Sequence, residues 1–217
     1  DRVVEGKSLL YSWESGGGSS FLGNYFNYLS SPFTVLIFLF DKADISFAIT
    51  ALVIVKCMAS AVTFTYYLKA SQKRHSYVSA AFGVFYAFCA YFLAYYWNIM
   101  WIDGMILLPL IVLGIEQLVN NGKGALYTGA LAVLLLSNYY MGYMACIFSV
   151  LYFLAYFLMT AKPRPEKSGE KLTTREKYSA KNLMRHPFLN RCARFAGFSL
   201  LAGGLCAVTL LPTYFLL

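Results

Sequence analysis

The chain contains several apolar segments that each approach the length of a membrane-crossing helix, separated by short polar or charged stretches. The clearest are Ile45–Leu68, Ser76–Tyr96 and Gly104–Val119. A helix needs about 20 mostly apolar residues to cross a bilayer. Of the 217 residues, 59% are hydrophobic and 13% are charged, whereas soluble domains carry about 25% charged residues. A soluble domain of this size has too small a core for so many apolar side chains. The sequence therefore predicts an all-α polytopic transmembrane helical bundle.

The segment before the first clear span has a different pattern. Aromatic and apolar residues recur in it at helical spacing, which predicts an amphipathic helix at the membrane interface; they are Phe21, Tyr25, Tyr28 and Leu29. Pro32–Phe40 is apolar but too short to span. The alternative is one span over Phe21–Phe40, which carries no charge. Four Asn and Ser residues and Pro32 within that range count against it.

The remaining segments complete the expected organisation. Ala125–Ala161 is too long for one helix and suits two, with the polar and aromatic cluster Ser137–Gly142 as the break. The prediction is then an outer juxtamembrane loop with interfacial helices (1–44), a bundle of about five transmembrane helices (45–161), a basic cytoplasmic loop (162–194) and a further transmembrane helix (195–217). Because residue 1 is Asp, we expect the chain to be a fragment of a longer protein.

The distribution of charge predicts the orientation of these segments. Alternating the loops across the membrane places fourteen of the eighteen Lys and Arg residues on one side, ten of them in residues 162–194. The positive-inside rule makes that side cytoplasmic. Residues 1–44, Trp97–Asp103 and Ser137–Gly142 then face outward together. The net charge of +8 is explained by topology, so no nucleic-acid partner is expected.

The stretch Trp97–Asp103 is the first candidate site because it places one acid among aromatic residues at the mouth of an apolar helix. Asp103 either binds or activates a polar substrate, or is a solvated loop acid or helix N-cap. Trp97 and Trp101 either belong to an interfacial aromatic belt or stack on sugar rings. Asn98 lies between them and joins the candidate substrate-binding residues.

Polar residues within or beside other spans are further candidates, since intramembrane ionisable groups face a cavity or a partner. Lys56 is a candidate to meet a phosphate headgroup as a point charge. Glu116 is expected to snorkel or to pair with the basic loops. Asn138, Tyr139 and Tyr140 either bind a ligand or hydrogen-bond between helices. No metal site built from protein ligands is expected.

Four stretches, in this order, resemble the bacterial YfhO-type family of multipass membrane proteins, which have a GT-C glycosyltransferase-like architecture. They are GKSLLYSWESGGGSSFLGNYFNYLSSPF, NIMWIDGMILLPLIVLGIEQL, LLLSNYYMGYMACIF and LLPTYFLL. The resemblance implies transfer of a sugar from a polyprenyl-phosphate-linked donor to a cell-envelope acceptor, such as lipoteichoic acid, on the outer face of the bacterial cell membrane.

The resemblance also implies a division of roles among the residues. A carboxylate would deprotonate the acceptor hydroxyl, and cationic groups, with or without a divalent metal, would stabilise the departing lipid phosphate. GT-C enzymes place the catalytic acid in their first outer loop, and Asp1 does not match it. We therefore expect the base to lie before residue 1 and Asp103 to be auxiliary. The alternatives are a membrane transporter or lipid flippase, and a non-catalytic scaffold.

Overall fold

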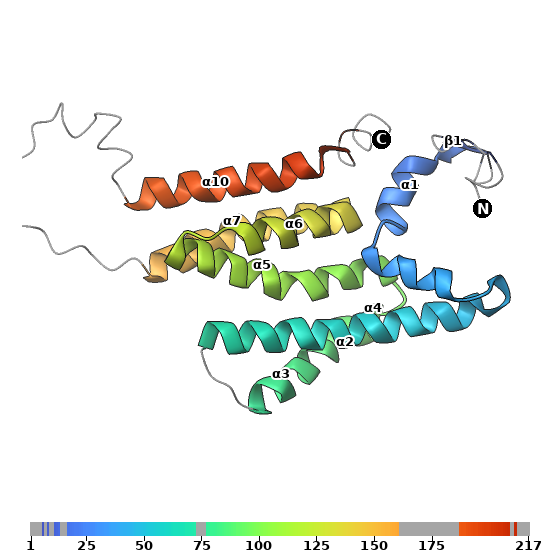
Figure 1. The fold of residues 1–217 in the computed structure, drawn as a ribbon, viewed down its shortest axis with the longest axis horizontal. Helices are drawn as coiled ribbons and strands as arrows, with labels where there is room; N and C mark the ends of the chain where they lie inside the picture. Colours follow the sequence, from blue (N-terminus) through green and yellow to red (C-terminus); the bar gives the residue numbers. More distant parts are fainter. Residues whose placement is uncertain are drawn as a thin grey trace, which may run out of the picture.

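The helices run alternately in opposite directions, which brings their connections to two ends of an elongated bundle (Figure 1). The computed structural model describes residues 6, 8, 11–13, 17–72, 77–160, 187–208 and 211. The two histidines of the chain, His75 and His186, lie outside these residues. The helices of the bundle are α2 (Ile45–Gln72), α3 (Tyr77–Ala87), α4 (Ala90–Tyr95), α5 (Ile102–Asn121), α6 (Ala125–Ser137), α7 (Tyr139–Thr160) and α10 (Pro187–Leu205).

The segment before α2 folds as short elements at one end of the bundle, here called the α1 end. Two short antiparallel strands, β1 (Tyr11–Ser12) and β2 (Ser19–Ser20), lead into α1 (Phe21–Tyr28). Two 3₁₀ helices, η1 (Pro32–Leu39) and η2 (Lys42–Asp44), follow it. The predicted short helix is confirmed. The alternative of one span over residues 21–40 is wrong, because α1 ends at Tyr28 and the 3₁₀ helix η1 begins at Pro32.

Four helical stretches among the described residues are long and apolar enough to cross a membrane: Ile45–Gln72, Tyr77–Tyr95, Ile99–Asn121 and Tyr139–Thr160. The helix α6, with 13 residues, is apolar but shorter. The predicted break within 125–161 is confirmed, since α6 ends at Ser137 and α7 begins at Tyr139. The all-α bundle expected from the apolar pattern is thus confirmed, with one two-stranded hairpin added to it.

Three boundaries differ from the sequence prediction. The segment Ser76–Tyr96 is interrupted, because Cys89 is extended (φ −65°, ψ 163°) and separates α3 from α4. Asp103 lies in the first turn of α5 instead of in a loop, because the 3₁₀ helix η3 (Ile99–Trp101) continues directly into α5. The last helix begins at Pro187, so residues 187–194 belong to α10 and not to the basic loop.

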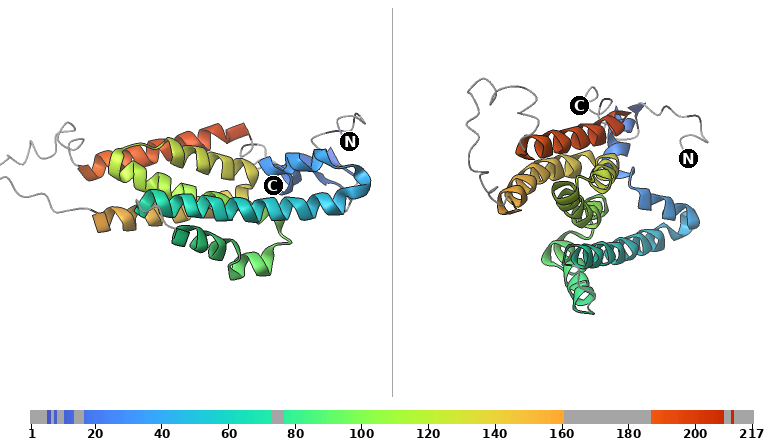
Figure 2. Two further views of the ribbon diagram at one scale, coloured as in Figure 1. Left: turned by 60° about the horizontal axis from the view of Figure 1, so that its bottom comes forward. Right: turned by 60° about the vertical axis from the view of Figure 1, so that its left-hand side comes forward.

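The helix α5 is the central element of the bundle. It packs on α2, α6, α7 and α10, and α3 and α10 lie at opposite edges of the bundle (Figures 1 and 2). The most apolar window of α5 is 67% buried, compared with 22% to 28% in the other three candidate spans. The other spans therefore leave much of their apolar surface exposed, as helices that face lipid do.

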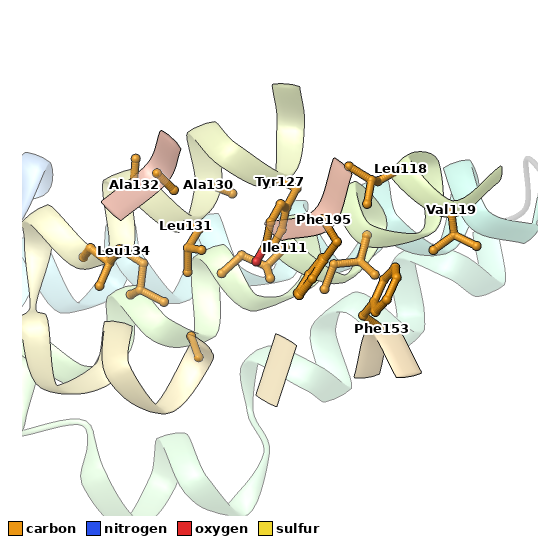
Figure 3. Packing of buried hydrophobic residues seen from close by; sticks show 14 of the residues in the cluster. Ile111, Leu118, Val119, Tyr127, Ala130, Leu131, Ala132, Leu134, Phe153 and Phe195 are labelled. Carbon is orange, nitrogen blue, oxygen red and sulfur yellow. The ribbon is translucent and has the colours of Figure 1, made fainter. Parts of the chain in front are cut away.

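The main core lies between α5, α6, α7 and α10 and is built on stacked aromatic rings (Figure 3). The centroid of the Phe195 ring lies 4.4 Å from the centroid of the Phe153 ring and 5.4 Å from that of the Tyr127 ring. The Tyr127 hydroxyl lies 2.8 Å from the Ser199 Oγ, so its polar end is also satisfied. These contacts fix α10 against α6 and α7.

The close approach of α5 to α6 predicts a specific sensitivity to size. A Cβ added at Gly114 would lie 2.5 Å from the backbone nitrogen of Tyr127. Gly114→Ala should therefore lower the free energy of unfolding by about 1–3 kcal/mol, because the two backbones must separate. Gly129→Ala on α6 is the matched control, since nothing lies within 4 Å of its added Cβ. Thermal unfolding of both purified variants measures the difference, and equal midpoints would contradict the packing.

Candidate functional site

A buried ion pair between Lys56 and Asp103 lies near the α1 end of the bundle. The Lys56 Nζ is 3.0 Å from Asp103 Oδ1 and donates to Asp103 Oδ2 at 3.1 Å. The same Nζ donates to the carbonyl oxygen of Ile99 at 3.0 Å. Both charged side chains are 1% exposed. The pair joins α2 to the start of α5, so it fixes two elements that are far apart in the sequence.

Helix lengths explain how a residue in the middle of α2 reaches the first turn of α5. The helix α2 has 28 residues and α5 has 20, which makes α2 about 12 Å longer at 1.5 Å per residue. Its first turns extend beyond α5 at the α1 end (Figure 1). Lys56 is therefore level with Asp103 although it lies well inside its own helix.

The polypeptide around the pair shields it from solvent. The 3₁₀ helix η1 packs against α2, and the ring of Phe33 lies 5.8 Å from the Lys56 Nζ. Ser31 is buried beside the same carboxylate. The N-terminus of α5 favours a negative charge in its first turn. Asp103 is not the N-cap, because Trp101 holds that position without a side-chain cap bond.

The second feature of this end is an aromatic pocket of about 640 Å³ between α3, α4, α5 and α7. Its walls are almost entirely apolar, and they include Tyr91, Tyr95, Trp101, Gly104, Tyr140 and Phe148. The rings of Tyr95 and Trp101 are 6.0 Å apart. Trp101 and Gly104 lie on either side of Asp103 in the sequence, so the ion pair holds in place the segment that forms one wall of the pocket.

Some of the predicted site residues line the aromatic pocket and others do not. Trp101 and Tyr140 line the aromatic pocket from different helices. Trp97 is 64% exposed and its indole Nε1 donates to the Ala94 carbonyl oxygen at 3.0 Å. Asn98 is buried. Trp97 and Asn98 are not among the residues that line the pocket.

Asn138 has a structural role at the turn between α6 and α7. It is fully buried, and its Oδ1 accepts a hydrogen bond of 2.9 Å from the Met141 nitrogen. This bond satisfies a free backbone donor in the first turn of α7. Tyr139 is half-buried beside it. The interpretation of Asn138 as a group that stabilises the helices fits this geometry.

Sequence reasoning missed the contact that attaches the N-terminal segment to the bundle. The Ser30 Oγ lies 2.6 Å from the Leu136 carbonyl oxygen and 2.9 Å from that of Ser137. Both carbonyl groups belong to the last turn of α6, where no backbone N–H of the helix is available to donate to them. This contact could not be predicted from the sequence, because a single serine near a proline is common in loops.

Glu116 was expected to snorkel or to pair with the basic loops, but its described contacts are with side-chain hydroxyls inside the bundle. Its carboxylate accepts hydrogen bonds from the hydroxyls of Tyr67, Ser71 and Tyr152. It lies at the far end of the bundle, defined here as the end where α2, α5 and α7 finish. It is therefore not part of the site around Lys56 and Asp103.

The described residues do not fit a metal centre. No group of three or more His, Cys, Asp or Glu side chains within the described ranges is placed to hold an ion. At the candidate site, Asp103 is the one acid and Lys56 neutralises it. That ammonium would repel a divalent metal ion, so Asp103 is a poor metal ligand in this arrangement.

Comparison with known proteins identifies the group to which this architecture belongs. The family model described as bacterial membrane protein YfhO matches residues 1–217. The chain belongs to the YfhO family of bacterial membrane proteins. A stretch of 72 residues is 35% identical to a Bacillus subtilis (strain 168) protein described as uncharacterized protein YfhO.

That match covers 33% of this chain and 8% of the length of the relative. No solved structure matches the chain. Membership of the YfhO family confirms the resemblance found in the sequence. Together with the long apolar helices, it shows a membrane-embedded protein.

The buried pair predicts a large effect of removing one charge. Lys56→Met leaves the Asp103 carboxylate buried without its partner, so the free energy of unfolding should fall by about 3–5 kcal/mol. Lys69→Met, on the same helix but outside the pair, is the control and should change it by less than about 1 kcal/mol. Unfolding of the purified variants in detergent measures both. Equal effects of the two substitutions would show that the pair does not stabilise the fold.

Proposed function

We propose that the chain is part of a membrane glycosyltransferase that moves a sugar from a polyprenyl-phosphate-linked donor to a cell-envelope acceptor, such as teichoic acid. The observation that carries this proposal is the aromatic pocket beside the Lys56–Asp103 pair. An apolar pocket of about 640 Å³ lies within the size range of small-molecule sites. Aromatic side chains suit both the apolar faces of sugars and an isoprenoid chain.

The proposed orientation puts this pocket at the outer face of the bacterial cell membrane. Four described basic residues, Lys69, Lys123, Arg191 and Arg194, belong to the far end, where α2 and α5 finish and α6 and α10 begin, whereas Lys42 alone lies in the elements before α2 that the structure describes. Asp41 and Asp44 lie at the α1 end. The positive-inside rule then makes the far end cytoplasmic and the α1 end extracytoplasmic. A polyprenyl-linked sugar presented at the outer leaflet meets the pocket directly.

Within this proposal, Asp103 acts through position. Its carboxylate is 1% exposed and engaged with Lys56, so the acceptor hydroxyl cannot reach it in this arrangement. The pair instead holds the segment that carries Trp101 against the pocket. Trp101 and Tyr140 contact the substrate, and another residue of the full-length protein supplies the base. A direct contact of Lys56 with phosphate, and of Trp97, Asn98, Asn138 or Tyr139 with substrate, stays a prediction.

A flippase for the same sugar lipid is the second candidate. The interruption between α3 and α4 at Cys89 favours it, because transporters use discontinuous helices beside their substrate sites. Both candidates need the lipid-linked sugar to enter the aromatic pocket. They differ in whether the sugar is transferred to an acceptor or crosses the membrane on its carrier.

Transfer of radiolabelled sugar from polyprenyl phosphate to envelope acceptor, measured with full-length protein in vesicles, tests the proposal. Trp101→Ala should lower transfer by roughly tenfold, because stacking of one aromatic side chain is worth about 0.5–1.5 kcal/mol and its buried area adds to this. Trp13→Ala is the matched control and should stay within about twofold, since Trp13 is 79% exposed and does not line the pocket.

The remaining outcomes decide between the candidates. Labelled acceptor means a transferase, whereas movement of the sugar lipid across vesicles without labelled acceptor means a flippase. Absence of both activities in the full-length protein would contradict the two proposals and favour a scaffold. Equal losses in the two tryptophan variants would remove the aromatic pocket from the substrate site.

A further inference from the structure

Glu116 is a buried acid without a cationic partner among the described residues. It is 7% exposed. Oε1 accepts hydrogen bonds from Tyr67 at 3.1 Å and Tyr152 at 2.9 Å, and Oε2 accepts one from Ser71 at 2.7 Å. Asp103, on the same helix, has Lys56 as its counter-ion. An intramembrane acid whose described partners are all hydroxyls indicates a binding site.

Beside Glu116 lies a polar pocket of about 460 Å³, separate from the aromatic pocket. Besides Glu116, its polar lining comes from Ser71, Gln117, Asn120, Asn121, Lys123 and Tyr156. Glu116 is buried, whereas Asn120, Asn121 and Lys123 are exposed. The pocket therefore has a negative charge at depth and a positive charge near its opening.

The free acceptors in this pocket suit a group with several hydrogen-bond donors. A carboxylate oxygen accepts two hydrogen bonds, and Oε2 receives one in the described structure. The amide nitrogen of Asn120 donates to the Tyr156 hydroxyl at 2.8 Å, which leaves the Asn120 carbonyl oxygen available. A primary ammonium carries three donors and one positive charge, so it matches these acceptors and neutralises Glu116.

The position of the pocket along the helices points to a lipid. Ser71 directly precedes Gln72, the last residue of α2, and Asn120 and Asn121 are the last two residues of α5. Three apolar spans finish around this point, so the pocket lies at the depth of lipid headgroups. Basic residues between helix ends bind lipid phosphates. A bare metal ion fits less well, because the pocket is far larger than a single coordination shell.

We propose that this pocket binds the zwitterionic headgroup of an aminophospholipid, with its primary ammonium at Glu116 and its phosphate at Lys123. The site is independent of the proposed glycosyl transfer, since it lies at the opposite end of the bundle. Bound lipid would connect α2, α5 and α7 through a charged contact at the depth where these helices end.

Lipid retention by the full-length protein tests this proposal. Purified protein is incubated with equal amounts of phosphatidylethanolamine, phosphatidylcholine and phosphatidylglycerol, and the retained lipids are identified by native mass spectrometry. The wild-type protein should retain phosphatidylethanolamine roughly tenfold over phosphatidylcholine, because the methylated headgroup has no ammonium hydrogen to donate and loses charge-assisted bonds. Equal retention of these two lipids, or preference for phosphatidylglycerol, would overturn the proposal without any variant.

Two variants and one control locate the site. Glu116→Gln should bring retention of phosphatidylethanolamine down to that of phosphatidylcholine. Lys123→Ala changes an exposed side chain and should weaken retention severalfold even if the Glu116 variant does not fold. Asp44→Asn removes an exposed acid at the α1 end and should leave retention unchanged. Retention equal to wild type in both pocket variants contradicts the assignment.

Discussion

The ion pair between Lys56 and Asp103 is the constraint on which the arrangement of the α1 end depends. Two opposite charges in apolar helices are tolerated only when each neutralises the other and the remaining donors are used. The 3.0 Å contact between Lys56 Nζ and Asp103 Oδ1 and the bond to the Ile99 carbonyl meet this requirement. The pair fixes the position of α2 along α5, and the part of α2 that extends beyond α5 gives η1 a surface to pack on.

The central position of α5 connects the two ends of the molecule. Its first turn carries Asp103 and one wall of the aromatic pocket, and its last turns carry Glu116 and the polar pocket. One acid has a lysine as its partner, whereas the other has hydroxyls alone. The same helix thus uses its two acids differently, one to hold the fold and one, in our proposal, to hold a lipid headgroup.

The fold was predictable from the sequence wherever a local pattern determined it. Apolar length predicted the spans, and the polar cluster around Asn138 predicted the turn between α6 and α7. The pairing of Lys56 with Asp103 was not predicted, because it depends on the offset between two helices of different length. The interruption at Cys89 was also missed, since a backbone turn of this kind needs neither Gly nor Pro. Of the candidate site residues, Trp101 and Tyr140 line one pocket, but their shared position needed tertiary structure to be seen.

The most direct test of this account is a double-mutant cycle on the pair, measured as free energies of unfolding of the full-length protein. The variants are Lys56→Met, Asp103→Leu and the two combined. The account predicts that the double variant is nearly as stable as wild type, because apolar side chains replace a neutralised buried pair at little cost. The coupling energy should then be at least about 3–5 kcal/mol, which is the loss expected for Lys56→Met alone. Strictly additive losses would show that the two charges do not stabilise each other, and would contradict the central role given to them.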